Sequence, residues 1–289
     1  MIFKFSVFVL LFASQAFAKN FIIGGQDVKP TDPIQASTVG LFDPSPDGKS
    51  GSLCSGTLIR KDIAVTAAHC LEGGGAKPSL IFGRNLHSKN ATRREVEAVA
   101  INPKYKARAG KGMDQGDIAL VKFKGGLPKG YRAVPTVSSD NDIKKGDKVT
   151  LAGYGISNSR TKEGAGKLRR ADVRISNNRP KKSEMILDQS HGRGACHGDS
   201  GGPAYLKRGS KIKLAGVTNR GYPSTAPDDC AHKVVYTKLS AYRSWIQKSE
   251  SKLEQTKLSR SNVLRRSLKR VPHQRVHLAR TKKTRTKRA

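Results

Sequence analysis

Acidic residues are scarce in this chain of 289 residues. Only 22 are Asp or Glu, against 55 Lys or Arg, so the formal net charge at pH 7 is +33. A charge of this size attracts anionic polymers and surfaces, and the attraction weakens steeply with salt. It says nothing about fold. Because 36% of the residues are hydrophobic, the chain can fill a core, and a wholly disordered chain is excluded.

Long apolar runs are missing outside the N-terminus. Residues 1–18 combine Lys4, the apolar run FSVFVLLFA and small residues in AFA, which is the pattern of a secretory signal. That run is too short to span a bilayer, and no other stretch is apolar enough. We therefore expect a secreted protein, extracellular or periplasmic, with no transmembrane segment after maturation.

Cysteine is also rare, with four residues in the chain. Export makes disulfides plausible, and four cysteines allow three full pairings that spacing alone does not choose between. The sequence CHGD at 196–199 has no second Cys/His pair at ligand spacing, so it does not resemble a zinc site. We expect no metal and no cofactor.

Short β-leaning runs separated by Gly, Pro, Asn and Asp fill residues 22–245. The clearest are SLCSGTLI, IAVTAAHC, DIALVKF, KVTLAGYG, IKLAGVT and KVVYTKL. Many short strands with frequent turn signals predict an all-β barrel or sandwich rather than βαβ units.

The pattern changes from about Ser240. A run without Gly or Pro places Trp245, Ser249 and Leu253 four residues apart, which predicts a terminal helix with buried first turns, ended by Pro272. Residues 248–289 hold fifteen Lys or Arg and two Glu. This extension is either a tether to an anionic surface or polysaccharide, or a disordered tail without a partner. Aromatic residues for base stacking are missing after Trp245, so nucleic acid is disfavoured.

The stretch GDSGGP at 198–203 contains the best candidate nucleophile, Ser200. A serine hydroxyl needs a base that takes its proton and an acid that holds the base. His69 ends one predicted strand and Asp117 opens another, which are positions where a rigid scaffold can present a side chain. The N–H groups of Gly198 and Ser200 could converge on an oxyanion in a tight glycine turn.

Three motifs then stand in order: TAAHC at 66–70, DIALV at 117–121 and GDSGGP at 198–203. Together with IIGG at 22–25 and YRSWI at 242–246, they resemble the chymotrypsin and trypsin family of serine endopeptidases. The resemblance implies two packed six-stranded antiparallel β-barrels, with the active site between them, followed by a C-terminal helix and a basic tail.

The resemblance also divides the chain into functional parts. Residues 1–18 would be a signal peptide, 19–21 a short propeptide, 22–247 the protease domain and 248–289 a basic helical or disordered extension. Protein or peptide substrates would be cleaved through an acyl-enzyme. In this family a calcium-binding loop sometimes occurs, but GRNLHSKNATRREVE lacks an acidic cage for the ion.

Catalytic roles carry over residue by residue. Ser200 would be the nucleophile, His69 the general base and then the general acid, and Asp117 the group that orients His69. Gly198 and Ser200 would form the oxyanion hole. Asn219 stands where the family usually has a Ser supporting the Asp. Arg220 replaces a groove-lining Trp, and its charge would favour acidic residues upstream of the scissile bond.

Disulfides and activation are implied in the same way. With four cysteines the chain lacks several disulfides that are usual in animal members of the family, which favours a bacterial source. A new N-terminal amine at Ile22 would pair with Asp199 and order the oxyanion hole. Phe21 argues against trypsin as the activating protease. The four cysteines would form the pairs Cys54 with Cys70 and Cys196 with Cys230.

The specificity pocket differs from that of trypsin. Gly194 stands where trypsin-like members have an Asp that selects Arg or Lys. Gly221 would leave the entrance open and Val234 would reduce the depth. We expect small or medium uncharged side chains at P1, the residue before the scissile bond. Asp228 or Asp229 could reach the pocket instead, which leaves basic specificity open.

A second class of function is a cationic protein that binds polyanions and keeps a protease fold without turnover. Such a descendant would be free to lose the triad, but His69, Asp117 and Ser200 are all present.

Overall fold

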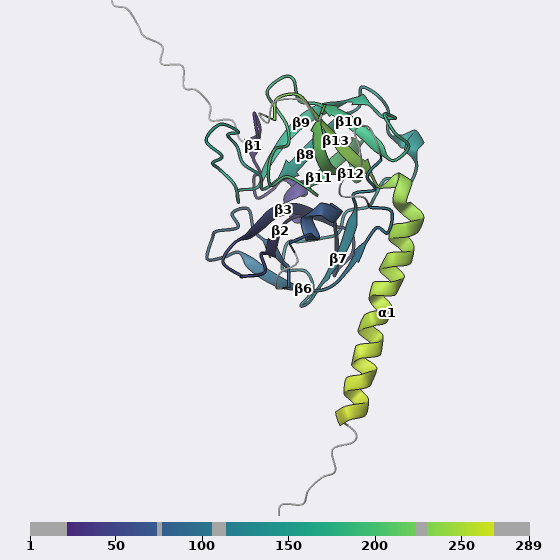
Figure 1. Ribbon diagram of the computed structural model, residues 1–289. Coiled ribbons are helices and arrows are strands. Elements are labelled where there is room, and N and C mark those ends of the chain that lie inside the picture. Colours follow the sequence, from purple (N-terminus) through teal and green to yellow (C-terminus); the bar gives the residue numbers. More distant parts are fainter. Residues whose placement is uncertain (1–21, 74–76, 106–113, 224–229, 269–289) are drawn as a thin grey trace, which may run out of the picture.

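The structure is a computed structural model (Figure 1). The structure describes residues 22–73, 77–105, 114–223 and 230–268, with backbone alone for 256–268. The expected signal peptide, the tripeptide at 19–21, Asp228, Asp229 and the end of the basic tail lie outside the described residues.

The first barrel is a closed antiparallel sheet in the order β2-β3-β4-β7-β6-β5. Val39, Leu41, Leu58 and Leu80 are fully buried inside it, because successive side chains of a barrel strand alternate between interior and exterior. Its strands are β2 (Thr38–Pro44), β3 (Gly51–Leu58), β4 (Ile63–Thr66), β5 (Ser79–Phe82), β6 (Thr92–Ile101) and β7 (Ala119–Phe123).

The second barrel closes in the order β8-β9-β10-β13-β12-β11, since β8 pairs with both β9 and β11, and β1 adds to β9. The predicted all-β fold of two six-stranded antiparallel barrels with a C-terminal helix is therefore confirmed. Its strands are β1 (Gln26–Asp27), β8 (Lys148–Gly153), β9 (Arg169–Asn177), β10 (Glu184–Asp188), β11 (Pro203–Arg208), β12 (Lys211–Tyr222) and β13 (Lys233–Lys238). Short 3-10 helices are η1 (Pro33–Ala36), η2 (Ala68–Leu71), η3 (Asp140–Asp142) and η4 (Ser240–Tyr242).

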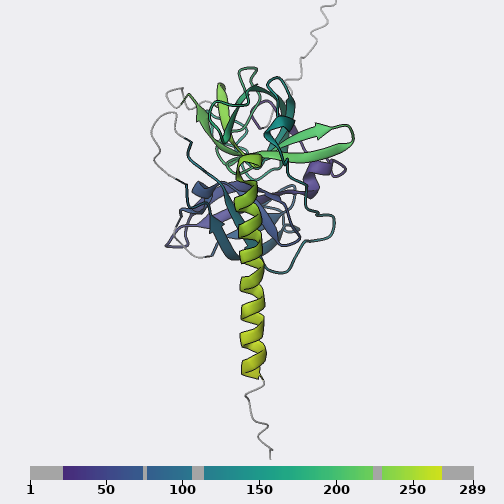
Figure 2. The same ribbon diagram turned by 90° about the vertical axis from the view of Figure 1, so that its right-hand side faces the viewer.

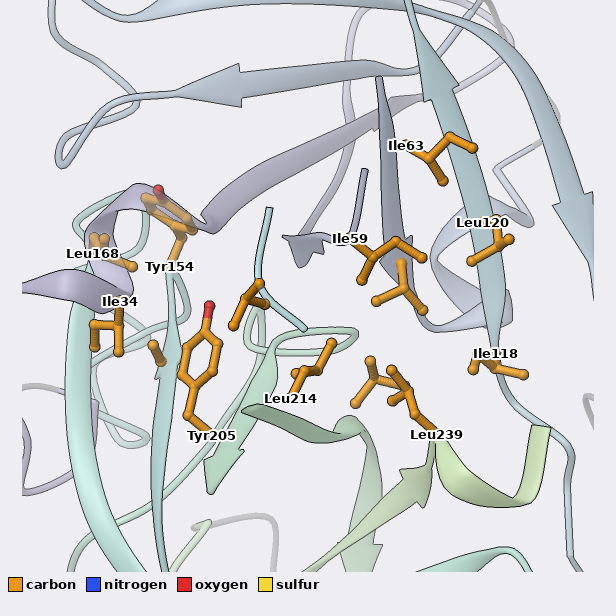
Figure 3. Packing of buried hydrophobic residues seen from close by; sticks show 14 of the residues in the cluster. Ile34, Ile59, Ile63, Ile118, Leu120, Tyr154, Leu168, Tyr205, Leu214 and Leu239 are labelled. Atoms are coloured by element: carbon orange, nitrogen blue, oxygen red, sulfur yellow. The ribbon is translucent and has the colours of Figure 1, made fainter. Parts of the chain in front are cut away.

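The two barrels share one hydrophobic cluster, which Figure 3 shows around Tyr154 and Tyr205. The Tyr205 hydroxyl hydrogen-bonds Ser37 Oγ at 2.7 Å and Thr38 Oγ1 at 2.9 Å. The Tyr154 hydroxyl donates to the carbonyl of Gly83 at 2.9 Å. Because both tyrosines come from the second barrel and their partners come from the first, these bonds fix the relative position of the barrels.

The C-terminal helix α1 (Arg243–Leu268) starts at the second barrel, passes along the first and projects beyond it (Figures 1 and 2). Leu253 is buried in the shared cluster. Lys122, only 1% exposed, donates from Nζ to the carbonyl of Leu253 at 3.0 Å, and Arg60 pairs with Glu250 at 2.8 Å. Helix α1 is therefore still packed against the barrels at Glu250 and Leu253. None of the helices in the described part of the chain has the length and apolar character needed to cross a bilayer.

Candidate active site

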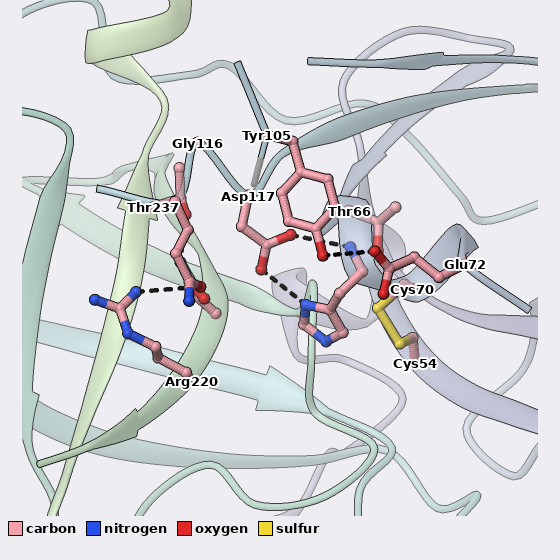
Figure 4. A network of polar contacts seen from close by, with 12 residues as sticks. Cys54, Thr66, Cys70, Glu72, Tyr105, Gly116, Asp117, Arg220 and Thr237 are labelled. Atoms are coloured by element: carbon pink, nitrogen blue, oxygen red, sulfur yellow. Dashed lines mark hydrogen bonds and ion pairs between the residues drawn. A yellow bond between two sulfur atoms is a disulfide. The ribbon is translucent and has the colours of Figure 1, made fainter. Parts of the chain in front are cut away.

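His69 and Asp117 meet because their strands are neighbours. Strands β4 and β7 pair with Thr66 opposite Ala119, so the chain after β4 and the chain before β7 lie side by side. His69 follows in η2 and directs its Nδ1 to Asp117 Oδ2 at 2.7 Å. Its backbone N–H donates to Asp117 Oδ1 at 3.0 Å (Figure 4). Asp117 is 1% exposed, so both bonds stabilise a buried carboxylate.

Asn219 supplies a third donor to this carboxylate. Its Oδ1 faces two donors, Arg220 Nη1 at 3.1 Å and Thr237 Oγ1 at 3.2 Å, and this orientation turns Nδ2 toward Asp117 Oδ2 at 3.1 Å. A guanidinium can only donate, so Arg220 fixes which way the Asn219 amide points. Asn219 thus replaces the serine hydroxyl expected at this position with an oriented amide.

Arg220 itself is held by a bidentate ion pair. Its Nη1 and Nη2 lie 2.7 and 3.1 Å from the two carboxylate oxygens of Glu184, which is buried. Arg220 also lines the cavity beside Ser200, so the positive charge expected beside the substrate is present but is offset by Glu184. No pattern in the sequence pointed to Glu184, which stands 36 residues away in the chain.

The environment of His69 favours its protonated form. Burial by itself lowers the pKa, but the hydrogen bond and the charge of Asp117 outweigh it, and Glu72 adds a smaller effect, so the pKa is raised above 6.5. Glu72 is kept near by the hydroxyl of Tyr105, which donates to its Oε1 at 3.0 Å. The ring can therefore accept a proton readily once it is neutral.

The turn that carries Ser200 packs against the segment leading to His69. The Ser200 carbonyl accepts from Ser55 N at 2.8 Å, and Ser55 Oγ donates to the Gly198 carbonyl at 2.9 Å. A Cβ on Gly201 would come within 2.1 Å of Thr66 Oγ1, and Gly201 has φ +74°, so only glycine fits there. Gly198 also has positive φ, at +91°. The turn that holds Ser200 is thus packed against β3 and against Thr66 at the end of β4, the strand that leads to His69.

A cavity of about 430 Å³ opens beside Ser200. Gly221 and Val234 line it as expected, and open space surrounds the missing Cβ of Gly221. Gly194 does not itself line the cavity. The side chain of Gln189 lies over Gly194 and lines the cavity in its place. The sequence pattern did not mark Gln189. Among the described residues no Asp or Glu lines this cavity.

Asp199 is buried beside the cavity wall. Its Oδ1 accepts from Gly155 N at 2.8 Å and its Oδ2 from Cys196 N at 2.9 Å. Burial raises the pKa of its carboxyl to about 6, although these bonds and the charges of Arg169 and His197 act in the opposite direction. Ile22 is also buried, and the next residue, Ile23, accepts from Gly194 N at 2.8 Å, so the N-terminal segment lies along this wall.

Two disulfides are present in the described residues. Each pairs cysteines next to the site, and the sulfur atoms are 2.02 and 1.98 Å apart. Because each sulfur is bonded to another sulfur, neither pair offers thiolate ligands to a metal beside the neighbouring His69 or His197. The bonded pairs are Cys54–Cys70 and Cys196–Cys230.

Comparisons with known proteins agree with this geometry. A family model described as Trypsin matches residues 22–246. A vitellin-degrading protease of Bombyx mori is 29% identical over 261 residues, covering 80% of this chain and 86% of the relative. Granzyme B(G,H) of Mus musculus is 29% identical over 244 residues, covering 79% and 90%.

A solved structure of neuropsin, a serine protease expressed in the limbic system of mouse brain, superposes with a TM-score of 0.63. It is 25% identical, and the match covers 78% of this chain and 98% of that one. The proteins in these comparisons come from animals and give no support to the bacterial source expected from the missing disulfides.

Proposed function

Because the chain belongs to the trypsin family and is a serine endopeptidase, we propose that Ser200, His69 and Asp117 form its catalytic triad. The observation that carries this proposal is the pair of bonds from His69 to buried Asp117, next to the turn that holds Ser200. With Nδ1 engaged by Asp117, the Nε2 of His69 is the nitrogen left to take the Ser200 proton.

The reaction then proceeds in two halves. Ser200 Oγ attacks the scissile carbonyl while His69 takes its proton, and the resulting imidazolium is stabilised by Asp117. His69 returns the proton to the leaving amine, which leaves an acyl-enzyme for water to hydrolyse. The N–H groups of Gly198 and Ser200 hold the oxyanion, an interaction worth about 3 kcal/mol for a donor in this chemistry.

The cavity beside Ser200 supports a preference for small or medium uncharged P1 residues. Val234 narrows it, no described acid lines it, and the basic side chains of His197 and Lys233 stand at its wall. A Lys or Arg side chain would lose hydration there without gaining a counter-charge. Basic specificity through Asp228 or Asp229 is the alternative, and it concerns residues outside the described part of the chain.

Maturation would consist of two cuts. The signal peptide would direct export and be removed after residue 18, and removal of 19–21 would free the Ile22 amine to pair with Asp199. The raised pKa of Asp199 supports this pairing, because a buried carboxylate gains most from a new positive charge. The extension at 248–289 would act as a tether to an anionic surface or polysaccharide, through charge rather than shape.

The first test is a P1 scan on protein that begins at Ile22, with peptides that differ only at that residue and with Ser200→Ala as the blank. We expect cleavage after Ala, Val, Leu or Met. Cleavage confined to Arg and Lys would contradict the neutral pocket. A second outcome concerns heparin, a polyanion. If Ser200→Ala binds heparin as well as the unmodified protein does and keeps its biological effect, the protein acts by binding polyanions rather than by catalysis.

A further inference from the structure

Gln189 lies directly after β10, lines the cavity and is 2% exposed. Its amide is fully engaged by the surrounding backbone. Nε2 donates to the carbonyls of Ala195 at 3.2 Å and Cys230 at 3.0 Å, and Oε1 accepts from Ala195 N at 2.7 Å. The side chain therefore bridges the two walls that the Cys196–Cys230 disulfide also connects.

The same side chain fills the space that belongs to residue 194. A Cβ built on Gly194 would stand 2.1 Å from Gln189 Cδ, 2.2 Å from Oε1 and 2.4 Å from Cγ. Real atoms do not approach this closely, and Gln189 cannot swing aside without breaking its three hydrogen bonds in a buried place. While Gln189 holds this position, residue 194 has no room for a side chain, so only glycine fits there.

We propose that Gln189 is the floor of the specificity pocket and is the residue that sets its depth and its neutrality. The proposal rests on the proposed function, since it names what the same pocket accepts. Both amide hydrogens of Gln189 already have acceptors, so the floor offers no charge and no free donor to an entering side chain. Aliphatic P1 groups that stop short of the floor fit, whereas long basic groups meet a neutral, engaged amide.

The size arm of the test compares two substitutions at this position. Gln189→Ala removes the floor, and Gln189→Met removes the same hydrogen bonds but keeps the length of the side chain. We expect the ratio of kcat/KM for Phe over Ala at P1 to rise at least about tenfold in Gln189→Ala, since single methylene differences in such pockets change rates by 10- to 200-fold. The ratio in Gln189→Met should stay near that of the unmodified enzyme. An unchanged ratio in folded Gln189→Ala overturns the proposal.

A second test, of charge, measures the binding of benzamidine, an aromatic cation, by calorimetry or by thermal shift. Gly194→Asp alone should not bind it, because Gln189 occupies the space of the new carboxylate. The double variant Gly194→Asp with Gln189→Ala should bind it. Equal binding by the single and double variants shows that Gln189 does not block position 194, and it overturns the proposal.

Benzamidine binding needs no catalysis, so the two ideas fail separately. If the unmodified protein cleaves no peptide and Ser200 resists diisopropyl fluorophosphate, the proposed function fails. In that case the proposal that Gln189 forms the floor of the pocket is still supported if the double variant binds benzamidine and the single variant does not.

Discussion

Removing the amide of Asn219 tests how the buried Asp117 is held. Asn219→Ala deletes one of three donors to this carboxylate, the Nδ2 bond of 3.1 Å, and leaves the two bonds from His69 in place. A hydrogen bond to a charged group contributes about 1.5–3 kcal/mol. If the contribution is made in the transition state, kcat/KM falls about 10- to 150-fold.

The pH profile separates this role from a general loss of structure. In the proposed role His69 is a base only when it is neutral, so kcat/KM should rise with pH through its pKa, which is raised above 6.5. With fewer donors on Asp117, more of its charge acts on His69, and the acidic limb should move to higher pH. Asn219→Ser keeps a short hydrogen-bond donor, so it should restore both kcat/KM and the pH at which the acidic limb lies.

The control is a second amide of similar kind. Asn178 Nδ2 donates to the carbonyl of Ile143 at 2.9 Å, away from Asp117. Asn178→Ala should lower Tm without moving the acidic limb. The reasoning would be refuted if the fall in kcat/KM for Asn219→Ala equals the fraction of folded protein lost and the acidic limb of the pH profile stays where it is.

Two further predictions concern maturation and the helix. Burial raises the pKa of Asp199 to about 6, above its ordinary value of 3.8, so its ionisation destabilises the precursor above pH 6 and has no effect below about 3.8. Asp199→Asn loses an acceptor for one of two backbone N–H groups in both forms, but only protein beginning at Ile22 also loses the proposed ion pair, so at pH 8 its Tm should fall further than that of the precursor. Equal falls in thermal scans would refute the ion pair. Truncation after Gln255 should leave Tm unchanged, whereas truncation after Gln247 should cost about 2–5 kcal/mol of unfolding free energy through loss of Leu253 alone. Equal urea midpoints for the two truncations would contradict this.

Local signals in the sequence were sufficient for the fold class and for the triad candidates. Short β-leaning runs broken by turn residues predicted an all-β barrel or sandwich, and the family resemblance of three motifs implied the two barrels. His69 and Asp117 stood at strand edges that prove to be adjacent. The pairing of β4 with β7 depends on barrel closure, which no single stretch encodes. The four cysteines left three pairings open for the same reason.

Contacts between distant side chains escaped prediction. Glu184 neutralises Arg220 and Gln189 covers Gly194, and both residues looked like ordinary members or neighbours of a strand. The burial of Leu253 in the shared cluster likewise depends on partner residues that are distant in the sequence. Patterns along the chain show which face is apolar, but they do not show which partner covers it.

The attachment of helix α1 to the first barrel has a consequence for biosynthesis. A ribosome makes the first barrel early, yet the buried ammonium of Lys122 can donate its hydrogen bond to the carbonyl of Leu253 only when most of the chain has been translated. The earliest half is thus completed by the latest segment. A nascent or interrupted chain lacks this hydrogen bond, so the packing around Lys122 is completed only after translation has passed Leu253.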